Sequence, residues 1–296
     1  MIRLTIIIVI YGKECFDSRT LQSLKLCPLH QNITLFIFNN GPRLLSEDKC
    51  YELFDEQIKK NKINLILKQN INNIPLSVIY NDAIKENAAS DYFMILDDDT
   101  EIPSSYFAFN ANRFDFDLSV PLIKTGESEE FFYPIVDGII PIKKQSVDDY
   151  EEIYTISSGL MISKSLTETF KCYFNDVFDT RFAFYGIDFN FFRRLRIIKH
   201  HGHYFRLFIA EPIRHSLSRF DGEQTEWRNI ERIYDVVLSL KYYEKRNMVK
   251  VVKLARLVSS SLLKFKFRSI KAIFYSLLVG MHPRSKKYIS NKKIIK

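Results

Sequence analysis

The stretch YFMILDDDTEIP, residues 92–103, determines how the rest of the sequence is interpreted. Five consecutive apolar residues lead directly into Asp97, Asp98 and Asp99. A short, uninterrupted apolar run predicts a strand buried on both faces of a parallel sheet, and ligands of open α/β sheets gather where such strands end. The sequence therefore predicts a binding site at residues 97–99.

The three adjacent carboxylates indicate a bound cation, because like charges held this close repel one another. Asp97 and Asp99 are two residues apart, which places both on the same side of an extended chain. Carboxylate oxygens are ligands that Mg²⁺ and Mn²⁺ prefer, and a diphosphate could complete the ion's shell. The alternative is a solvated acidic turn that caps a helix starting near Pro103.

Strands and helices are expected to alternate through the first hundred residues. The expected strands are 3–10, 33–38, 63–67 and 92–96, and the expected helices are 17–26, 47–60 and 75–86. This alternation predicts a doubly wound, mostly parallel α/β sheet with helices on both faces. The first strand is not followed by GxGxxG, and GxxxxGK[ST] does not occur, so dinucleotide-binding and P-loop functions lose their main support.

Shorter segments are expected after Pro103. Strands are predicted at 118–123, 131–136, 139–143, 153–162 and 203–209, a loop at 211–216, and helices at 187–199 and 223–246. The two serines and the glycine at 157–159 are expected either beside the path of a substrate or in a simple turn.

The charge is divided unevenly along the 296 residues. The whole chain carries +8, yet residues 241–296 hold 16 Lys and Arg against one acidic residue, a net charge of +15. Residues 1–240 hold 27 Lys and Arg against 34 acidic residues, a net charge of −7. The distribution predicts an enzyme domain at 1–240 and a basic helical tail at 241–296.

The cysteines and the N-terminus bear on the cellular compartment. Cys15, Cys27, Cys50 and Cys172 show neither CxxC nor zinc-site spacing, so reduced, packed thiols of a cytosolic protein are expected. Residues 1–11 resemble the apolar core of a signal peptide, but a small-residue cleavage site does not follow, and a buried first strand is expected. The apolar runs are all shorter than the roughly 18 residues of a membrane-spanning helix.

Three separated pieces of the sequence resemble glycosyltransferase family 2, whose members have the GT-A fold and are mostly inverting enzymes of bacterial surface polysaccharide synthesis. The first piece is the opening strand and turn at 6–11 together with the Phe-Asn-Asn-Gly turn at 38–41. The second is 96–99, which resembles the Asp-x-Asp motif of the family, and the third is 185–194. A phosphatase with a strand ending in Asp-x-Asp is less well matched, since Glu101 stands where it needs Thr or Val.

The resemblance implies a role for individual residues. Donor-binding residues are expected to be Tyr11, Asn39, Asp97 and Asp98, metal ligands Asp99, Asp97 and His215, and the catalytic base Asp188. Two positions depart from the family pattern: Asn39 replaces the usual Asp, and the usual Glu-Asp pair is reduced to Ile187-Asp188. Asp188 could equally be a plain helix N-terminal cap, and a lone histidine such as His215 is often structural.

The function implied is metal-dependent transfer, with Mn²⁺ or Mg²⁺, of a sugar from a nucleotide-diphosphate donor to a saccharide hydroxyl. The donor is expected to be UDP- or dTDP-linked and the acceptor lipid-linked, as in an O-antigen or rhamnosyltransferase-like enzyme. The alternative is a catalytically silent protein that keeps the fold to bind carbohydrate or nucleic acid.

The tail alternates apolar residues with lysine and arginine, as in LLKFKFR at 262–268. This pattern is typical of basic amphipathic helices on anionic membrane surfaces, so a cytoplasmic enzyme bound peripherally to the inner face of the membrane is expected. The alternative is a helical hairpin that packs on the enzyme. Nucleic acid is not expected as a partner, since RRM, KH and zinc modules are not recognisable.

Overall fold

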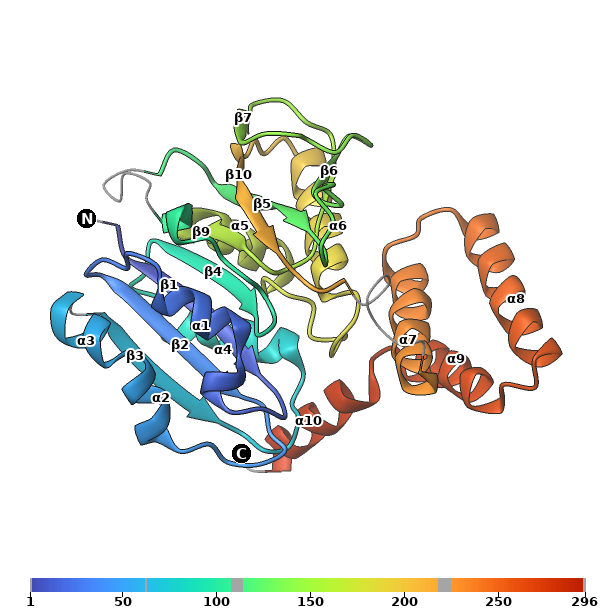
Figure 1. The fold of residues 1–296 in the computed structure, drawn as a ribbon. Helices are drawn as coiled ribbons and strands as arrows, with labels where there is room; N and C mark the ends of the chain where they lie inside the picture. The colour runs from blue at the N-terminus through green and yellow to red at the C-terminus, as the bar shows by residue number, and fades with distance from the viewer. Residues whose placement is uncertain (1, 62, 108–113, 218–224, 295–296) are drawn as a thin grey trace. The chain divides into compact units, whose positions relative to one another are not determined.

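The structure is a computed structural model that describes residues 2–61, 63–107, 114–217 and 225–294 (Figure 1). The chain divides into two compact units. The first comprises Met1–Asn73, Ile79–Val177 and Arg194–Gly222, and the second comprises Ile74–Val78, Phe178–Arg193 and Glu223–Lys296.

An eight-stranded sheet forms the centre of the first unit, in the order β3-β2-β1-β4-β9-β5-β10-β7. The strands are β1 (Leu4–Ile10), β2 (Ile33–Asn39), β3 (Asn64–Gln69), β4 (Tyr92–Asp97), β5 (Leu118–Lys124), β7 (Gln145–Val147), β9 (Leu160–Ser163) and β10 (Leu207–Arg214). The pairs among β1 to β4 are parallel, as is β5 with β10, whereas β9 and β7 run antiparallel to their neighbours. The prediction of a mostly parallel α/β sheet is therefore confirmed.

The register of the central strands brings their carboxyl ends to one edge. Every residue of β1 is buried, as expected for a strand covered on both faces. Val9 of β1 pairs with Asp97 of β4, and Ile10 pairs with Asn39 of β2. The residues that follow β1, β2 and β4 therefore start from neighbouring positions.

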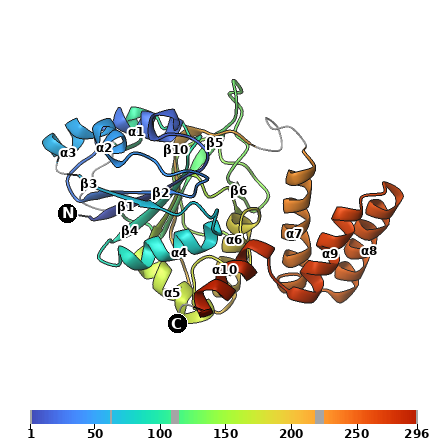
Figure 2. The same ribbon diagram turned by 90° about the horizontal axis from the view of Figure 1, so that it is seen from below.

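Helices cover both faces of this sheet. The short helices α1 (Arg19–Lys25), α2 (Glu47–Leu53) and α3 (Asp55–Asn61) lie on one face, and α4 (Leu76–Glu86) and α5 (Lys164–Phe174) lie on the other (Figure 2). The helix expected at 47–60 is divided at Phe54, whose side chain is fully buried.

The second half of the sheet differs from the expectation in several segments. Residues 139–143 do not form a strand, and the segment 131–136 is reduced to β6 (Ile135–Val136), which pairs with β8 (Ile153–Tyr154). The loop expected at 211–216 is wrong because β10 continues to Arg214 across an irregularity between Ala210 and Ile213. Pro212 and the charged residues around it suggested a loop, but pairing with β5 keeps the strand extended. Helix α5 was not expected. The described residues after Pro103, up to Phe107, form the 3₁₀ turn η2 (Ser104–Phe107).

The expectation of four reduced thiols is wrong for Cys15 and Cys50, which form a disulfide. Cys15 begins the 3₁₀ turn η1 (Cys15–Asp17), and Cys50 lies in α2. These elements place the two Cα atoms 5.5 Å apart although 35 residues separate them in sequence. Such proximity depends on tertiary packing, so cysteine spacing could not reveal it. Cys27 and Cys172 are free.

Helices make up most of the second unit. They are the start of α6 (Ile187–His200), α7 (Glu226–Tyr242), α8 (Asn247–Leu263), α9 (Phe267–Val279) and α10 (Pro283–Ile294). Helix α9 packs against both α7 and α8. Positions 223–224 of the helix expected at 223–246 lie outside the described residues. In the described part of the chain, none of the helices has the length and apolar character needed to cross a bilayer.

A buried ion-pair cluster joins α7 to α10 within the second unit. Glu231 accepts from His282 and from Arg284, whose Nη2 lies 2.9 Å from Glu231 Oε2. Burial opposes ionisation of Glu231, but the hydrogen bonds and charges of His282 and Arg284 outweigh it and lower the pKa of this carboxyl.

Candidate metal centre

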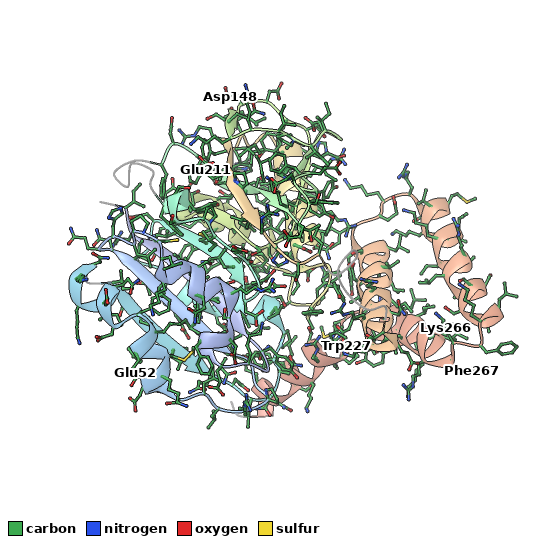
Figure 3. The ribbon with its side chains drawn as sticks, viewed as in Figure 1. Glu52, Asp148, Glu211, Trp227, Lys266 and Phe267 are labelled. Atoms are coloured by element: carbon green, nitrogen blue, oxygen red, sulfur yellow. A yellow bond between two sulfur atoms is a disulfide. The ribbon has the colours of Figure 1, made fainter. Side chains whose placement is uncertain are left out.

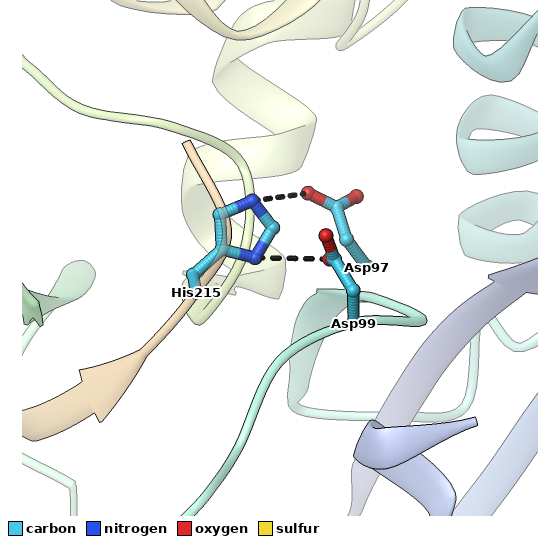
Figure 4. Close-up of side chains that lie close together, drawn as sticks. All are labelled: Asp97, Asp99 and His215. Carbon is cyan, nitrogen blue, oxygen red and sulfur yellow. Dashed lines mark ion pairs between the residues drawn. The ribbon is translucent and has the colours of Figure 1, made fainter. Parts of the chain in front are cut away.

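Three side chains from two strand ends converge in the first unit (Figure 4). Asp97 is the last residue of β4, Asp99 follows two residues later, and His215 comes directly after β10. Each offers one ligand atom, and these three atoms all lie within 4.8 Å of one another. The structure thus brings together the three residues that the sequence proposes as metal ligands.

The geometry fits a divalent cation. His215 Nδ1 lies 3.1 Å from Asp99 Oδ1, and His215 Nε2 lies 3.7 Å from Asp97 Oδ2. The imidazole is buried, with 9% of its surface exposed, whereas the Asp97 and Asp99 side chains are 32% and 33% exposed. Two carboxylates and one imidazole suit Mn²⁺, and the exposed side leaves room for further oxygen ligands from a substrate.

Helix α1 and its N-cap residue hold the backbone of the acidic turn by hydrogen bonds. The Ser18 hydroxyl donates to the Asp98 carbonyl at 2.9 Å, and the Thr20 hydroxyl donates to the Asp97 carbonyl. The Thr20 oxygen also accepts the Thr100 N–H at 2.9 Å. These bonds satisfy the backbone of a turn that leaves the sheet, and so fix where its carboxylates point.

A second set of hydroxyls fixes the histidine. Thr100 Oγ1 lies 3.0 Å from His215 Nδ1 and 2.5 Å from Ser158 Oγ. Ser158 Oγ in turn accepts the Asp97 N–H at 3.2 Å. All three hydroxyl and imidazole groups are buried. Sequence reasoning missed Thr100 as an orienting group; its position directly after the acidic triplet was the only available signal.

The acidic turn is electrostatically strained without a cation. Burial, followed by the charges of Asp99 and Asp98, raises the pKa of Asp97 to about 8, and a hydrogen bond from Tyr80 opposes the increase only partly. Part of the Asp97 side chain still reaches solvent, so an ion has access to it. A divalent cation would reverse this balance by favouring the ionised carboxylate.

Asp98 faces the loop after β1 and is separate from the three converging ligands. Its carboxylate forms an ion pair with Lys13 at 3.2 Å. Burial raises the pKa of Asp98, while Lys13 acts in the opposite direction. Lys13 is a second residue that sequence reasoning missed. Its position directly after the Tyr11-Gly12 turn, at the end of the first strand, was the available signal.

The two residues expected at the donor base differ in accessibility. Tyr11 follows β1 and is 50% exposed. Asn39 is buried: its amide donates to the Arg43 carbonyl at 2.7 Å and to Gln69 Oε1 at 2.9 Å, and its oxygen accepts the Gly41 N–H at 3.0 Å. Asn39 therefore shapes the turn after β2 with all of these contacts inside the protein.

Asp188 belongs to the second unit. It lies in the first turn of α6, is half-buried, and its Oδ1 accepts the N–H of Phe189 at 2.8 Å. The preceding Gly186 has φ +82°, and an added Cβ would meet the Asp235 carboxylate at 2.1 Å. The chain before Asp188 thus needs glycine for both conformation and space.

A cavity of about 500 Å³ opens beside the converging ligands. Asp99 and His215 line it together with two cations, Arg19 and Arg214, and two carboxylates, Glu101 and Glu127. The hydroxyl of Ser216, also at the wall, donates to Asp99. Most of the lining side chains are charged or polar, which suits a polar ligand such as a sugar or a phosphate.

Comparison with known proteins finds likeness in structure only: neither a family model nor a curated protein sequence matches the chain. TarS of S. aureus matches with TM-score 0.51 and 14% identity over 84% of this chain, which spans 41% of TarS. GalNAc-T7 with UDP, GalNAc and Mn²⁺ matches with TM-score 0.51 and 13% identity, covering 82% of this chain and 49% of that one. The mannosyltransferase PcManGT from Pyrobaculum calidifontis, in complex with GDP-Man and Mn²⁺, matches with TM-score 0.50 and 10% identity, covering 99% and 80%. These neighbours are GT-A glycosyltransferases, and the chain has their fold.

Proposed function

We propose that this protein is a metal-dependent inverting glycosyltransferase that moves a sugar from a nucleotide-diphosphate donor to a saccharide hydroxyl. The observation that carries the proposal is the convergence of Asp97, Asp99 and His215 at the carboxyl edge of a GT-A sheet. Two neighbours of the same fold were solved with a nucleotide or nucleotide sugar and Mn²⁺, which supports a metal at this edge.

The proposal assigns the donor to the ends of β1, β2 and β4. Mn²⁺ or Mg²⁺ held by Asp97, Asp99 and His215 would neutralise the charge that builds on the leaving diphosphate. Tyr11, accessible at the end of β1, binds the nucleoside, and Asn39 maintains the turn against which the base lies. Asp98 acts through Lys13, which its carboxylate holds beside the donor. We take the donor to be UDP- or dTDP-linked.

The chemical step needs a base for the acceptor. In the proposal the Asp188 carboxylate takes the proton of the acceptor hydroxyl as its oxygen attacks the anomeric carbon, a contribution typically worth about 10²- to 10⁴-fold. The bond from the anomeric carbon to the diphosphate oxygen breaks at the same time. Attack from the face opposite the leaving group inverts the anomeric centre.

The proposal extends to the acceptor and its setting. Residues 1–240 form the transferase domain, and the basic tail, 241–296, brings it to the inner face of the cell membrane. The acceptor is a lipid-linked saccharide of cell-surface polysaccharide synthesis, of the O-antigen type. The tail's net charge of +15 supports this placement.

Thermal stabilisation by nucleotides tests the donor site. UDP, dTDP, GDP and CMP are each added with and without Mn²⁺, and the melting temperature is recorded. We expect one nucleoside diphosphate to stabilise the protein only when Mn²⁺ is present, because ligands that bind the folded state alone raise its stability. Failure of every nucleotide to do so would refute the donor site.

Variants separate the proposed roles. Asp99→Asn is expected to abolish the Mn²⁺-dependent shift, whereas Asp188→Asn should retain it and lose transfer by about 10²-fold or more. Asp55→Asn, at an exposed position of α3 in an i,i+4 pair with Lys59, is the matched control and should change neither. Full transfer activity in Asp188→Asn would remove this residue from the mechanism without affecting the donor site.

A further inference from the structure

The turn between α8 and α9 exposes an unusual series of side chains. Residues 262–268, Leu-Leu-Lys-Phe-Lys-Phe-Arg, are here called the tip, and all seven are exposed. Leu263, Phe265 and Phe267 expose 81%, 79% and 72% of their surface. Figure 3 shows Lys266 and Phe267 in this region of the second unit. Large apolar side chains gathered at this degree of exposure mark an interaction surface.

The backbone of the tip is strained at Phe265, which has a positive φ. Phe265 has φ +50°, in the left-handed region where glycine is usual. The Lys266 N–H reaches back to the Ser261 carbonyl at 2.9 Å, the bond that typically closes a helix end around a left-handed residue. A phenylalanine there is unfavourable in the free protein, and with its ring exposed, packing offsets little of the cost.

Cations alternate with the apolar side chains of the tip. Lys264, Lys266 and Arg268 occupy every second position, and Asp and Glu do not occur from residue 245 to the end of the sequence. Arg268 forms an exposed ion pair with Glu226 of α7, so the two lysines carry most of the tip's positive charge.

The same chemistry continues along both helices. On α8, Met248, Val251 and Val252 are 77%, 62% and 60% exposed, and on α9 Phe274 and Leu278 are 51% and 83% exposed. On α8 two of these positions lie three and four residues after the first, and on α9 the two positions lie four residues apart. Each helix therefore presents exposed apolar side chains on one face in addition to those of the tip.

We propose that the tip inserts into the surface of an anionic lipid bilayer. Leu263, Phe265 and Phe267 enter the boundary of the acyl chains, while Lys264 and Lys266 contact lipid phosphates. This proposal rests on the membrane placement of the tail proposed above and specifies the residues that insert; it concerns the second unit alone and does not depend on glycosyl transfer.

The composition of the tip favours a membrane over other occupants. Nucleic acid would use the cations and could stack on Phe265 and Phe267, but the exposed aliphatic Leu262 and Leu263 would find no apolar environment there. A second copy of the same tip would bring lysines against lysines without a carboxylate between them. A bilayer with anionic headgroups offers phosphate and hydrocarbon within a few ångströms of each other.

Flotation of the full-length protein with vesicles tests the proposal. One set of vesicles is pure phosphatidylcholine, and in the other about a third of the lipid is phosphatidylglycerol, which supplies negative charge. We expect strong binding only to the anionic vesicles, with partial retention at high salt because the apolar contacts are not screened. Binding that is equal on both vesicles, or absent from both, would overturn the proposal.

Two apolar substitutions address insertion. Phe265→Gly with Phe267→Ser is expected to weaken vesicle binding by about 100-fold, since each buried aromatic ring contributes about tenfold. Because glycine suits the φ of residue 265, Phe265→Gly alone should leave the melting temperature unchanged or higher, so loss of binding cannot be ascribed to misfolding. Ile142→Ser is the matched control, at an 80% exposed apolar position of the first unit, and should bind as the parent does.

Two charge substitutions address the headgroups. Lys264→Gln with Lys266→Gln is expected to weaken binding to anionic vesicles by about 30-fold. Lys286→Gln with Lys287→Gln, at two exposed positions of α10, removes the same charge from the same tail as a control. If both pairs weaken binding equally, or if the two phenylalanine substitutions have no effect, attraction by net charge suffices and insertion of the tip is wrong.

Discussion

At the scale of single residues, the proposed site depends on Asp97, a partly exposed carboxylate whose charge is opposed by its acidic neighbours among the described residues. Lys13 is paired with Asp98, whereas Asp97 feels the charges of Asp99 and Asp98 and accepts a hydrogen bond from Tyr80. The charges of Asp99 and Asp98 destabilise the ionised form of Asp97. The free energy of that repulsion is what a divalent ion would recover on binding.

Metal affinity should therefore depend strongly on pH. Because the pKa of Asp97 is about 8 in the folded protein, its carboxyl is protonated near neutral pH and must lose the proton when the ion binds. We expect the dissociation constant for Mn²⁺ to fall about tenfold per pH unit below about 8 and to level off above it. Calorimetric titration across pH measures this, and a flat profile would contradict the assignment.

The stability of the metal-free protein should change with pH in the opposite direction to its affinity for Mn²⁺. The folded-state pKa of Asp97 lies above the ordinary value of 3.8, so the folded form binds more protons than the unfolded one across that interval. Asp97 therefore makes the metal-free protein less stable as the pH rises from about 4 to about 8. Added Mn²⁺ should cancel this loss.

Gly159 is a residue on which the orientation of Ser158 depends. It has φ +83°, and an added Cβ would lie 2.4 Å from the Pro121 side chain. Gly159→Ala is expected to lower the free energy of unfolding by about 1–3 kcal/mol and to weaken Mn²⁺ binding. Gly138→Ala, at φ +80° with open space around it, is the control for backbone strain alone. Equal losses in the two variants would mean that the close contact with Pro121 is unimportant.

At the scale of elements, the disulfide connects the segment after β1 with α2. Cys15 lies two residues beyond Lys13, so the bond restrains the loop that pairs with Asp98. The three helices on this face of the sheet, α1, α2 and α3, have seven residues each, and helices of this length are only marginally stable in isolation. The disulfide links α2 to the turn η1 and so adds a covalent restraint to this face.

Removing the disulfide should destabilise the first unit. The closed loop spans 35 residues, for which loop-closure entropy predicts a loss of about 3–4 kcal/mol in Cys15→Ser with Cys50→Ser. Urea denaturation under oxidising conditions measures the loss. Cys172→Ser, at an exposed free thiol, is the control and should be neutral. Parent stability that is unaffected by a reducing agent would show that the bond is absent in solution.

At the scale of the whole molecule, the two compact units are stabilised in different ways. The first relies on a sheet buried between helices, with a core that includes Ile6, Ile8, Leu35, Met94 and Leu96. The second relies on packed helices and on the buried cluster around Glu231. Only the first contains the proposed metal ligands.

Unfolding should therefore depart from a single cooperative transition. Trp227, the only tryptophan, lies in α7 of the second unit, so its fluorescence reports that unit, whereas far-ultraviolet circular dichroism reports both. We expect the two urea curves to differ, and Mn²⁺ to shift the dichroism curve more than the fluorescence curve. Coincident curves that shift together would show that the units unfold as one.

The sequence by itself determined the alternation of β1 to β4 with three helical segments, because apolar runs and turn residues report local conformation directly. It did not predict that the segment 47–60 divides into α2 and α3 at Phe54. It also identified Asp97, Asp99 and His215 as candidate ligands, on a motif and a family resemblance. Only the tertiary structure decided that these three side chains meet. The order of strands in the sheet brings the ends of β4 and β10 near each other, whereas the number of residues between Asp97 and His215 does not predict their distance in space. The same holds for Cys15 with Cys50, for the antiparallel insertion of β9, and for the hydroxyls of Thr100 and Ser158. Contacts between distant segments follow from packing, which local patterns do not encode.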